Sequence, residues 1–158
     1  LPRVGLSCRL TSVVSQARWF GLGPHEAYSD RCASALLGRW SASFQDLCTP
    51  YIVPQENGNR HECRWLQLHD ASERPNLVIQ GIENFDFSLS PYTLKELWEA
   101  KHWDRLPAIN AALDRGAVLH LDAAQRGLGT ASCGPDTLEQ YRLRPGLYRM
   151  ALVFSLAR

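Results

Sequence analysis

The sequence contains no long hydrophobic run and no cluster of positive charge. Its longest apolar stretch, near Met150 to Ala157, has about half the length that a bilayer-spanning helix requires. The 17 basic residues are balanced by 16 acidic residues, so the net charge is only +1. A nucleic-acid-binding surface needs a basic stripe, and no segment has one. We therefore expect neither a membrane nor a nucleic acid as a partner.

Short motifs for metal, phosphate or nucleophilic chemistry are also missing. No Cys-x-x-Cys pair occurs, and the odd number and wide spacing of the five cysteines favour free thiols over a set of disulfides. Free thiols are typical of a reducing compartment, so we expect the cytoplasm. No two histidines are four residues apart, and no Gly-x-Ser-x-Gly, Walker or Rossmann motif is present. The sequence thus predicts no metal or cofactor on this chain.

What the sequence does contain is the composition of one folded domain. Of its 158 residues, 45% are hydrophobic and 21% are charged, which disfavours disorder and permits a core. Apolar and polar residues alternate with a period of two in several short windows bounded by Gly, Pro, Asn or Asp. The expected strands are 4–10, 13–22, 62–69, 76–81, 85–89, 118–122 and 148–156. This pattern predicts an all-β fold.

One short helix interrupts the expected strands. Thr93 and Glu96 have the spacing of a capping box, and the residues that then share one helical face are Leu94, Leu97, Trp98 and Lys101. We expect this helix to be a connector that packs Trp98 onto a sheet. The stretch 43–59 is interrupted by proline and glycine, and we expect it to cross the fold as an irregular segment.

Four sequence blocks occur in an order that is specific to one family. They are 19–31 (WFGLGPHEAYSDR), 49–60 (TPYIVPQENGNR), 87–92 (FSLSPY), and 119–129 (LHLDAAQRGLG) continuing through 132–135 (SCGP). With these blocks the chain resembles the C-terminal, small-chain domain of family 2 β-galactosidases over nearly its whole length. The resemblance implies an antiparallel supersandwich related to the galactose mutarotase fold, with residues 1–158 as the C-terminal part of that domain. The chain would then lack the first strands and expose open sheet edges.

The resemblance also implies a function. The family hydrolyses terminal β-D-galactosyl residues by a two-carboxylate retaining route, and both carboxylates lie in a barrel domain outside this chain. The implied partners are that barrel domain, on the same or a companion chain, a galactoside substrate and further copies of the chain. Magnesium and sodium accompany family members, but the sequence identifies no ligands for them here. The alternative is a non-catalytic module of the same fold that binds carbohydrate or a partner.

Cys133 is the residue that the resemblance places at a substrate site. The family has a tryptophan in the loop after the Gly-Leu-Gly block, where it stacks on the incoming sugar, and Cys133 stands at the matching position. A thiol offers neither the area nor the π face for such stacking. We expect weakened affinity for the departing or accepting sugar. The alternative is a small buried thiol that does not contact the substrate.

Other candidate residues are interpreted as structural. Glu26 and Asp30 lie in a Gly-Pro turn, where carboxylates more often accept backbone hydrogen bonds or pair with an arginine such as Arg31. Glu56 is typical of a loop, and neither set forms a convincing acid–base pair for glycoside hydrolysis. His120 alternates with leucines on an expected strand and is interpreted as a structural histidine whose hydrogen bonds are satisfied. We expect at most one of the five tryptophans to contact a carbohydrate.

Overall fold

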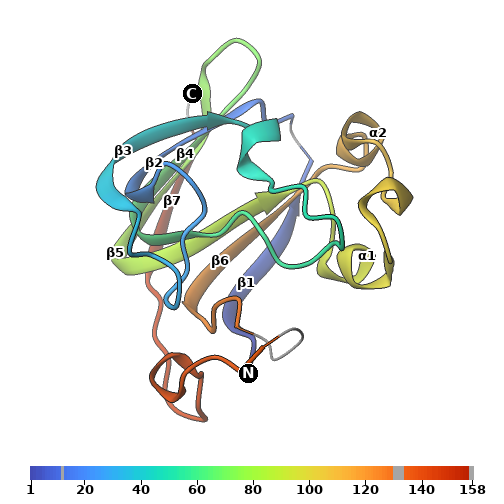
Figure 1. Cartoon of the computed structure of the whole chain (residues 1–158). Coiled ribbons are helices and arrows are strands. Elements are labelled where there is room, and N and C mark those ends of the chain that lie inside the picture. The colour runs from blue at the N-terminus through green and yellow to red at the C-terminus, as the bar shows by residue number, and fades with distance from the viewer. Residues whose placement is uncertain (12, 130–133, 157–158) are drawn as a thin grey trace.

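The computed structural model describes residues 1–11, 13–129 and 134–156, which build an antiparallel sheet with short helices beside it (Figure 1). The strands are β1 (Arg3–Leu10), β2 (Gln16–Gly23), β3 (Leu36–Ser43), β4 (Arg60–His69), β5 (Pro75–Ser90), β6 (Ala117–Gln125) and β7 (Leu152–Leu156). The helices are α1 (Leu94–Glu99) and α2 (Ile109–Leu113), with 3-10 turns at Gln45–Leu47, Trp103–Arg105 and Glu139–Tyr141. Among these residues, no helix has the length and apolar character needed to cross a membrane. The predicted all-β class is confirmed.

Strand β5 organises the sheet through its length of 16 residues. The strand order is β1-β6-β5-β4-β2-β3, and β7 pairs with β5 outside this path. Residues 86–90 of β5 pair with β6, whereas residues 77–81 pair with β7. Because β4 pairs along the other edge of β5, the sheet forks there into a β6–β1 arm and a β7 arm. The two short strands expected at 76–81 and 85–89 are therefore one continuous strand.

The main core collects on one face of the curled sheet. Every second residue of the central strands points to this face, as the period of a strand requires. The strand residues of this core are Ala17, Trp19, Cys63, Leu66, Leu68, Ile79, Phe85, Phe87, Leu89, Ala117, Leu119 and Leu121. Trp19 of β2 and Phe87 of β5 are fully buried and meet edge to face, with ring centroids 5.9 Å apart. This contact joins β2 to the strand that carries the fork.

The capping box at Thr93 is present, but the prediction for Trp98 is wrong. The Glu96 amide donates to the Thr93 hydroxyl at 3.2 Å, and the Glu96 carboxylate accepts from the Thr93 amide at 2.8 Å. Of the residues expected on one face, Leu97 does face inward, and it packs with Tyr92 and Ala112 in a small second core. Trp98 is 87% exposed. A helix of six residues buries one narrow stripe, and the neighbouring residue supplies it.

Strand β3 and helix α2 have no counterpart in the sequence-based expectation. Among the residues that the structure describes, strand β3 pairs with β2 alone. Its Leu36 and Leu37 are 68% and 52% exposed, so apolar and polar residues do not alternate clearly along it. Helix α2 has five residues, too few for a visible helical period. The expected C-terminal strand 148–156 is shorter and begins at Leu152.

The outer strands carry exposed apolar side chains. Strands β1, β3 and β7 each pair with one neighbour within the described part of the chain. Their large exposed apolar residues are Leu6, Leu36, Leu37, Val153, Phe154 and Leu156. Such edges attract further strands or a covering surface. The described residues form one open sheet, so the two-layered supersandwich stays a prediction.

Two tryptophans give a matched test of this core. Trp19→Ala empties the centre of the sheet and should lower the free energy of unfolding by about 3–5 kcal/mol. Trp98→Ala removes an exposed ring and should change it by no more than about 0.5 kcal/mol. Denaturant unfolding of the protein that carries this chain measures both. Equal losses would contradict the assignment of Trp19 to the core and Trp98 to the surface.

Candidate functional site

A buried carboxylate, Glu26, joins the first two sequence blocks. Glu26 is 5% exposed and accepts hydrogen bonds from the Gly58 amide at 2.8 Å, from the Tyr51 hydroxyl and from the Arg31 guanidinium. Burial acts to raise the pKa of Glu26, but these three donors outweigh it and hold the pKa below its ordinary value. Glu26 is therefore an ionised anchor between the turn 24–31 and the loop 49–60. The structural interpretation of Glu26 agrees with this geometry.

Asp30 holds the start of the segment that contains Cys133. Its two carboxylate oxygens accept from the amide of Leu128 at 3.1 and 3.0 Å, and one of them also accepts from the amide of Gly129 at 3.0 Å. Gly127 has φ = +95°, and a Cβ there would overlap the Asp30 carboxylate. The turn 24–31 thus serves as a cradle for the backbone of the Gly-Leu-Gly block.

The two ends of the Cys133 segment are tied together. The Thr137 amide donates to the Gly129 carbonyl at 3.0 Å, and Arg126 forms an ion pair with Asp136. Cys133 itself lies outside the described residues, so its expected contact with a sugar stays a prediction. The structure brings the Asp30 turn and the Gly-Leu-Gly block together, although they are almost 100 residues apart. Their position in the sequence offers no signal for this contact.

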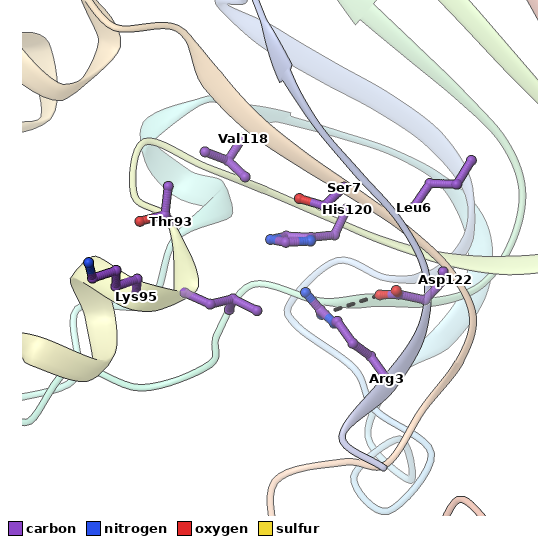
Figure 2. A pocket seen from close by; sticks show the side chains of 10 residues that line it. Arg3, Leu6, Ser7, Thr93, Lys95, Val118, His120 and Asp122 are labelled. Atoms are coloured by element: carbon purple, nitrogen blue, oxygen red, sulfur yellow. Dashed lines mark ion pairs between the residues drawn. The ribbon is translucent and has the colours of Figure 1, made fainter. Parts of the chain in front are cut away.

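A second group of polar residues lines a pocket between β1, β6 and α1 (Figure 2). Its volume is about 340 Å³, and its wall includes Arg3, Ser7, His120 and Asp122. Ser7 and His120 are direct partners in the β1–β6 pairing, so both side chains point to the sheet face that the pocket lies on. Nη2 of Arg3 lies 3.1 Å from Glu56 and 3.2 Å from Asp122. One arginine nitrogen therefore bridges two carboxylates.

The pocket residues are buried without full hydrogen bonding. His120 is 5% exposed, and among the described residues neither of its ring nitrogens has a partner. Asp122 is 1% exposed, and its contact with Arg3 is an ion pair without hydrogen-bond alignment. The interpretation of His120 as a satisfied histidine is therefore wrong. Its flanking leucines fill the core, whereas its own face of β6 meets a polar pocket in which no described residue is a hydrogen-bond partner for the imidazole.

Burial shifts the pKa values of these two groups toward their neutral forms. Burial, assisted by the nearby charge of Arg3, lowers the pKa of His120 to about 4. Burial also raises the pKa of Asp122 to about 7, with Arg3 acting against the shift and the carboxylates Asp86 and Glu56 acting with it. Near neutral pH His120 is uncharged, and the protonated form of Asp122 is well populated.

Glu56 and Asp122 do not form a hydrolytic pair. Glycoside hydrolysis by retention needs two carboxyls about 5 Å apart with the sugar linkage between them. Arg3 contacts an oxygen of each, so its guanidinium occupies the position where a linkage would lie. Burial raises the pKa of Glu56, and Arg3 counteracts this effect. Arg3 on β1 therefore links Glu56, in the loop before β4, to Asp122 on β6 by ion pairs.

Another buried carboxylate, Asp86, is fully engaged. It accepts from His61 at 2.8 Å, from the side-chain amide of Asn59 at 3.1 Å and from the backbone amide of Glu62 at 3.2 Å. Burial lowers the pKa of His61, but Asp86 outweighs it and raises this pKa above its ordinary value. Within the described ranges, no group of three or more His, Cys, Asp or Glu side chains is arranged to hold a metal ion.

Comparisons with known proteins agree with one another. The family model described as beta galactosidase small chain matches residues 1–155. Beta-galactosidases of Arthrobacter sp. (strain B7) and Actinobacillus pleuropneumoniae are 38% and 36% identical over 91% and 98% of this chain. The beta-galactosidase of Vibrio cholerae is 43% identical over 89% of it. The matched regions are 14%, 14% and 12% of those proteins, so the chain spans about one seventh of their length.

His120 and Asp122 predict opposite effects of pH on the stability of β6. Asp122 binds its proton more tightly in the folded state (pKa about 7 against 3.8), so its contribution is present at low pH and is lost as the pH rises through about 7. His120 binds its proton less tightly in the folded state (about 4 against 6.5), so its contribution is present above 6.5 and is lost as the pH falls through about 4. The linkage is worth on the order of 4 kcal/mol for Asp122 and on the order of 3 kcal/mol for His120. They compensate between about pH 4 and 6.5.

Replacing either His120 or Asp122 should reveal the pH dependence of stability that the other one contributes. In Asp122→Asn, the protection of β6 amides from hydrogen exchange should rise as the pH increases from about 4 to 6.5, because His120 alone remains. In His120→Leu, protection should fall over the same range because Asp122 alone remains. Hydrogen-exchange mass spectrometry, corrected for the intrinsic rate at each pH, measures both. Parallel pH profiles in the two variants would contradict the opposing linkage.

Asp30 should control the order of the Gly-Leu-Gly block. Asp30→Asn keeps the shape of the side chain but removes the charge and leaves one oxygen to accept from two amides. Exchange at Leu128 and Gly129 should accelerate about tenfold or more, because hydrogen bonds to a charged group are the stronger ones. Asp104→Asn, at an exposed position, is the matched control. Unchanged exchange in Asp30→Asn would remove Asp30 from this role.

Proposed function

The chain belongs to the β-galactosidase small-chain family, and from this premise we propose that it is the C-terminal part of a β-galactosidase. The observation that carries the proposal is the match of the small-chain model to residues 1–155. The whole protein would hydrolyse terminal β-D-galactosyl residues with retention, using two carboxylates in a barrel domain outside this chain. This agrees with the structural roles of Glu26, Asp30 and Glu56, which leave no acid–base pair among them.

The chain itself would support and shape the substrate site. The Asp30 cradle and the ion pair between Arg126 and Asp136 hold both ends of the segment that contains Cys133. Rigid ends favour a defined position for the residue between them, as a substrate platform requires. We propose that Cys133 stands at the position of this platform. Its small thiol would leave the departing or accepting sugar weakly held.

Partners, metal ions and a location are likewise proposed for the whole protein. Its partners would be the barrel domain, a galactoside and further copies of the chain, and the open edges of β1, β3 and β7 offer surfaces for such contacts. Magnesium and sodium would bind to parts of the protein outside this chain. Cys8, Cys32, Cys48 and Cys63 are free thiols, which supports a cytoplasmic location.

The assay that tests the proposal compares two forms of the protein that carries this chain. The whole protein should release galactose from a β-galactoside with retained anomeric configuration, followed by NMR of the first product. A form that ends before Leu1 should lose activity, because the support for the Cys133 segment is gone. No hydrolysis by the whole protein would favour the alternative of a non-catalytic carbohydrate-binding or partner-binding module.

A single substitution tests the position of Cys133. In the whole protein, Cys133→Trp restores a ring that can stack on a sugar, and it should tighten binding of glucose as an acceptor several-fold, up to about tenfold. Transglycosylation measured at increasing glucose concentrations gives this affinity. Cys8→Trp, at an exposed position on β1, is the control and should leave the affinity unchanged. An unchanged affinity in Cys133→Trp would count against the platform.

A further inference from the structure

We propose that the pocket between β1, β6 and α1 binds a neutral polyhydroxylated ligand, namely a monosaccharide or a terminal sugar unit (Figure 2). This inference goes beyond the proposed function, because it concerns this chain's own residues and requires no hydrolysis. Arg3, Ser7, His120 and Asp122 would make the contacts.

The pocket holds buried polar groups that have no partner within the described part of the chain. They include both nitrogens of His120, both oxygens of Asp122, and Nε and Nη1 of Arg3. His120 and Asp122 are 5% and 1% exposed, so bulk water supplies them with few hydrogen bonds. A buried polar group without a hydrogen bond destabilises the folded protein. A ligand that hydrogen-bonds to such groups is therefore bound more favourably. Figure 2 shows His120 and Arg3 directed into the same space.

The mixture of donors and acceptors selects the class of ligand. Arg3 only donates, Asp122 accepts when ionised and also donates when protonated, and a neutral His120 does one of each. Hydroxyl groups both donate and accept, so several hydroxyls on one ring satisfy this set. An anion would be repelled by the ionised carboxylate of Asp122, whereas a cation would be repelled by Arg3 and Lys95. The pocket therefore favours a neutral polyol over an ion.

The size and the walls of the pocket agree with a single sugar. The volume of about 340 Å³ lies at the lower end of the usual range of small-molecule sites. Leu94 is 41% exposed and supplies apolar surface for the C–H face of a sugar ring. Among the described residues no Phe, Tyr or Trp side chain lines the pocket, so binding should be weak, with a dissociation constant on the order of 1 mM.

The experiment uses crystals of the whole protein that carries this chain. They are soaked in a concentration series of D-galactose, of D-glucose and, as an anionic probe, of inorganic phosphate. We expect one of the two sugars to occupy the pocket with hydroxyls at hydrogen-bond distance from His120, Asp122 and Arg3. A pocket that holds phosphate, only water, or a segment of the protein's own chain would overturn the proposal.

Variants distinguish a built site from binding at crystal concentration only. His120→Leu keeps the bulk but removes both nitrogens, and it should raise the half-saturating sugar concentration more than tenfold. Ser7→Ala is a milder change that keeps the proposal testable if His120→Leu fails to fold, and it should raise this concentration several-fold. His69→Gln, at another buried histidine, is the matched control and should have no effect. Equal occupancy in all forms would mean binding at crystal concentration only and would overturn the site, whatever the galactosidase assay shows.

Discussion

The buried carboxylate of Glu26 is the constraint on which the loop structure depends. An ionised carboxylate at 5% exposure is tolerated only when donors surround it, and here they come from Arg31, Tyr51 and the Gly58 amide. Because these donors belong to two separate segments, satisfying one charge positions both the turn 24–31 and the loop 49–60. The same turn carries Asp30, which then orders the amides of Leu128 and Gly129.

The two faces of the sheet bury different kinds of side chain. One face buries a continuous apolar core centred on Trp19 and Phe87, and it provides most of the driving force for folding. The other face, near β1 and β6, buries Arg3, His120 and Asp122 with incomplete hydrogen bonding. A polar face of this kind contributes little to stability, but it holds chemically specific groups in fixed positions. The first face explains how the chain folds, and the second offers a site for a ligand.

Particular residues show how far the sequence could be read. Period-two alternation located the strands with one strongly apolar side, such as β6, because burial on one face imposes that pattern. It did not locate β3, whose edge position leaves most of its side chains partly exposed. The capping box marked the start of α1, but the buried stripe of that helix is set by Tyr92 and Ala112, which lie outside it. The resemblance in four blocks identified the family, although it did not reveal the pocket beside α1.

The amino-acid sequence by itself determined the class of the fold, most of its strands, the start of α1 and the family to which the chain belongs. These properties are local or additive, since alternation, caps and ordered motifs can be recognised within short windows. Only the tertiary structure decided that Asp30 supports the Gly-Leu-Gly block, that Arg3 bridges Glu56 and Asp122, and that His120 lacks a partner. Such contacts join residues far apart in the chain. Their existence follows from how the strands pair and from which face each side chain takes, and no short window of sequence contains that information.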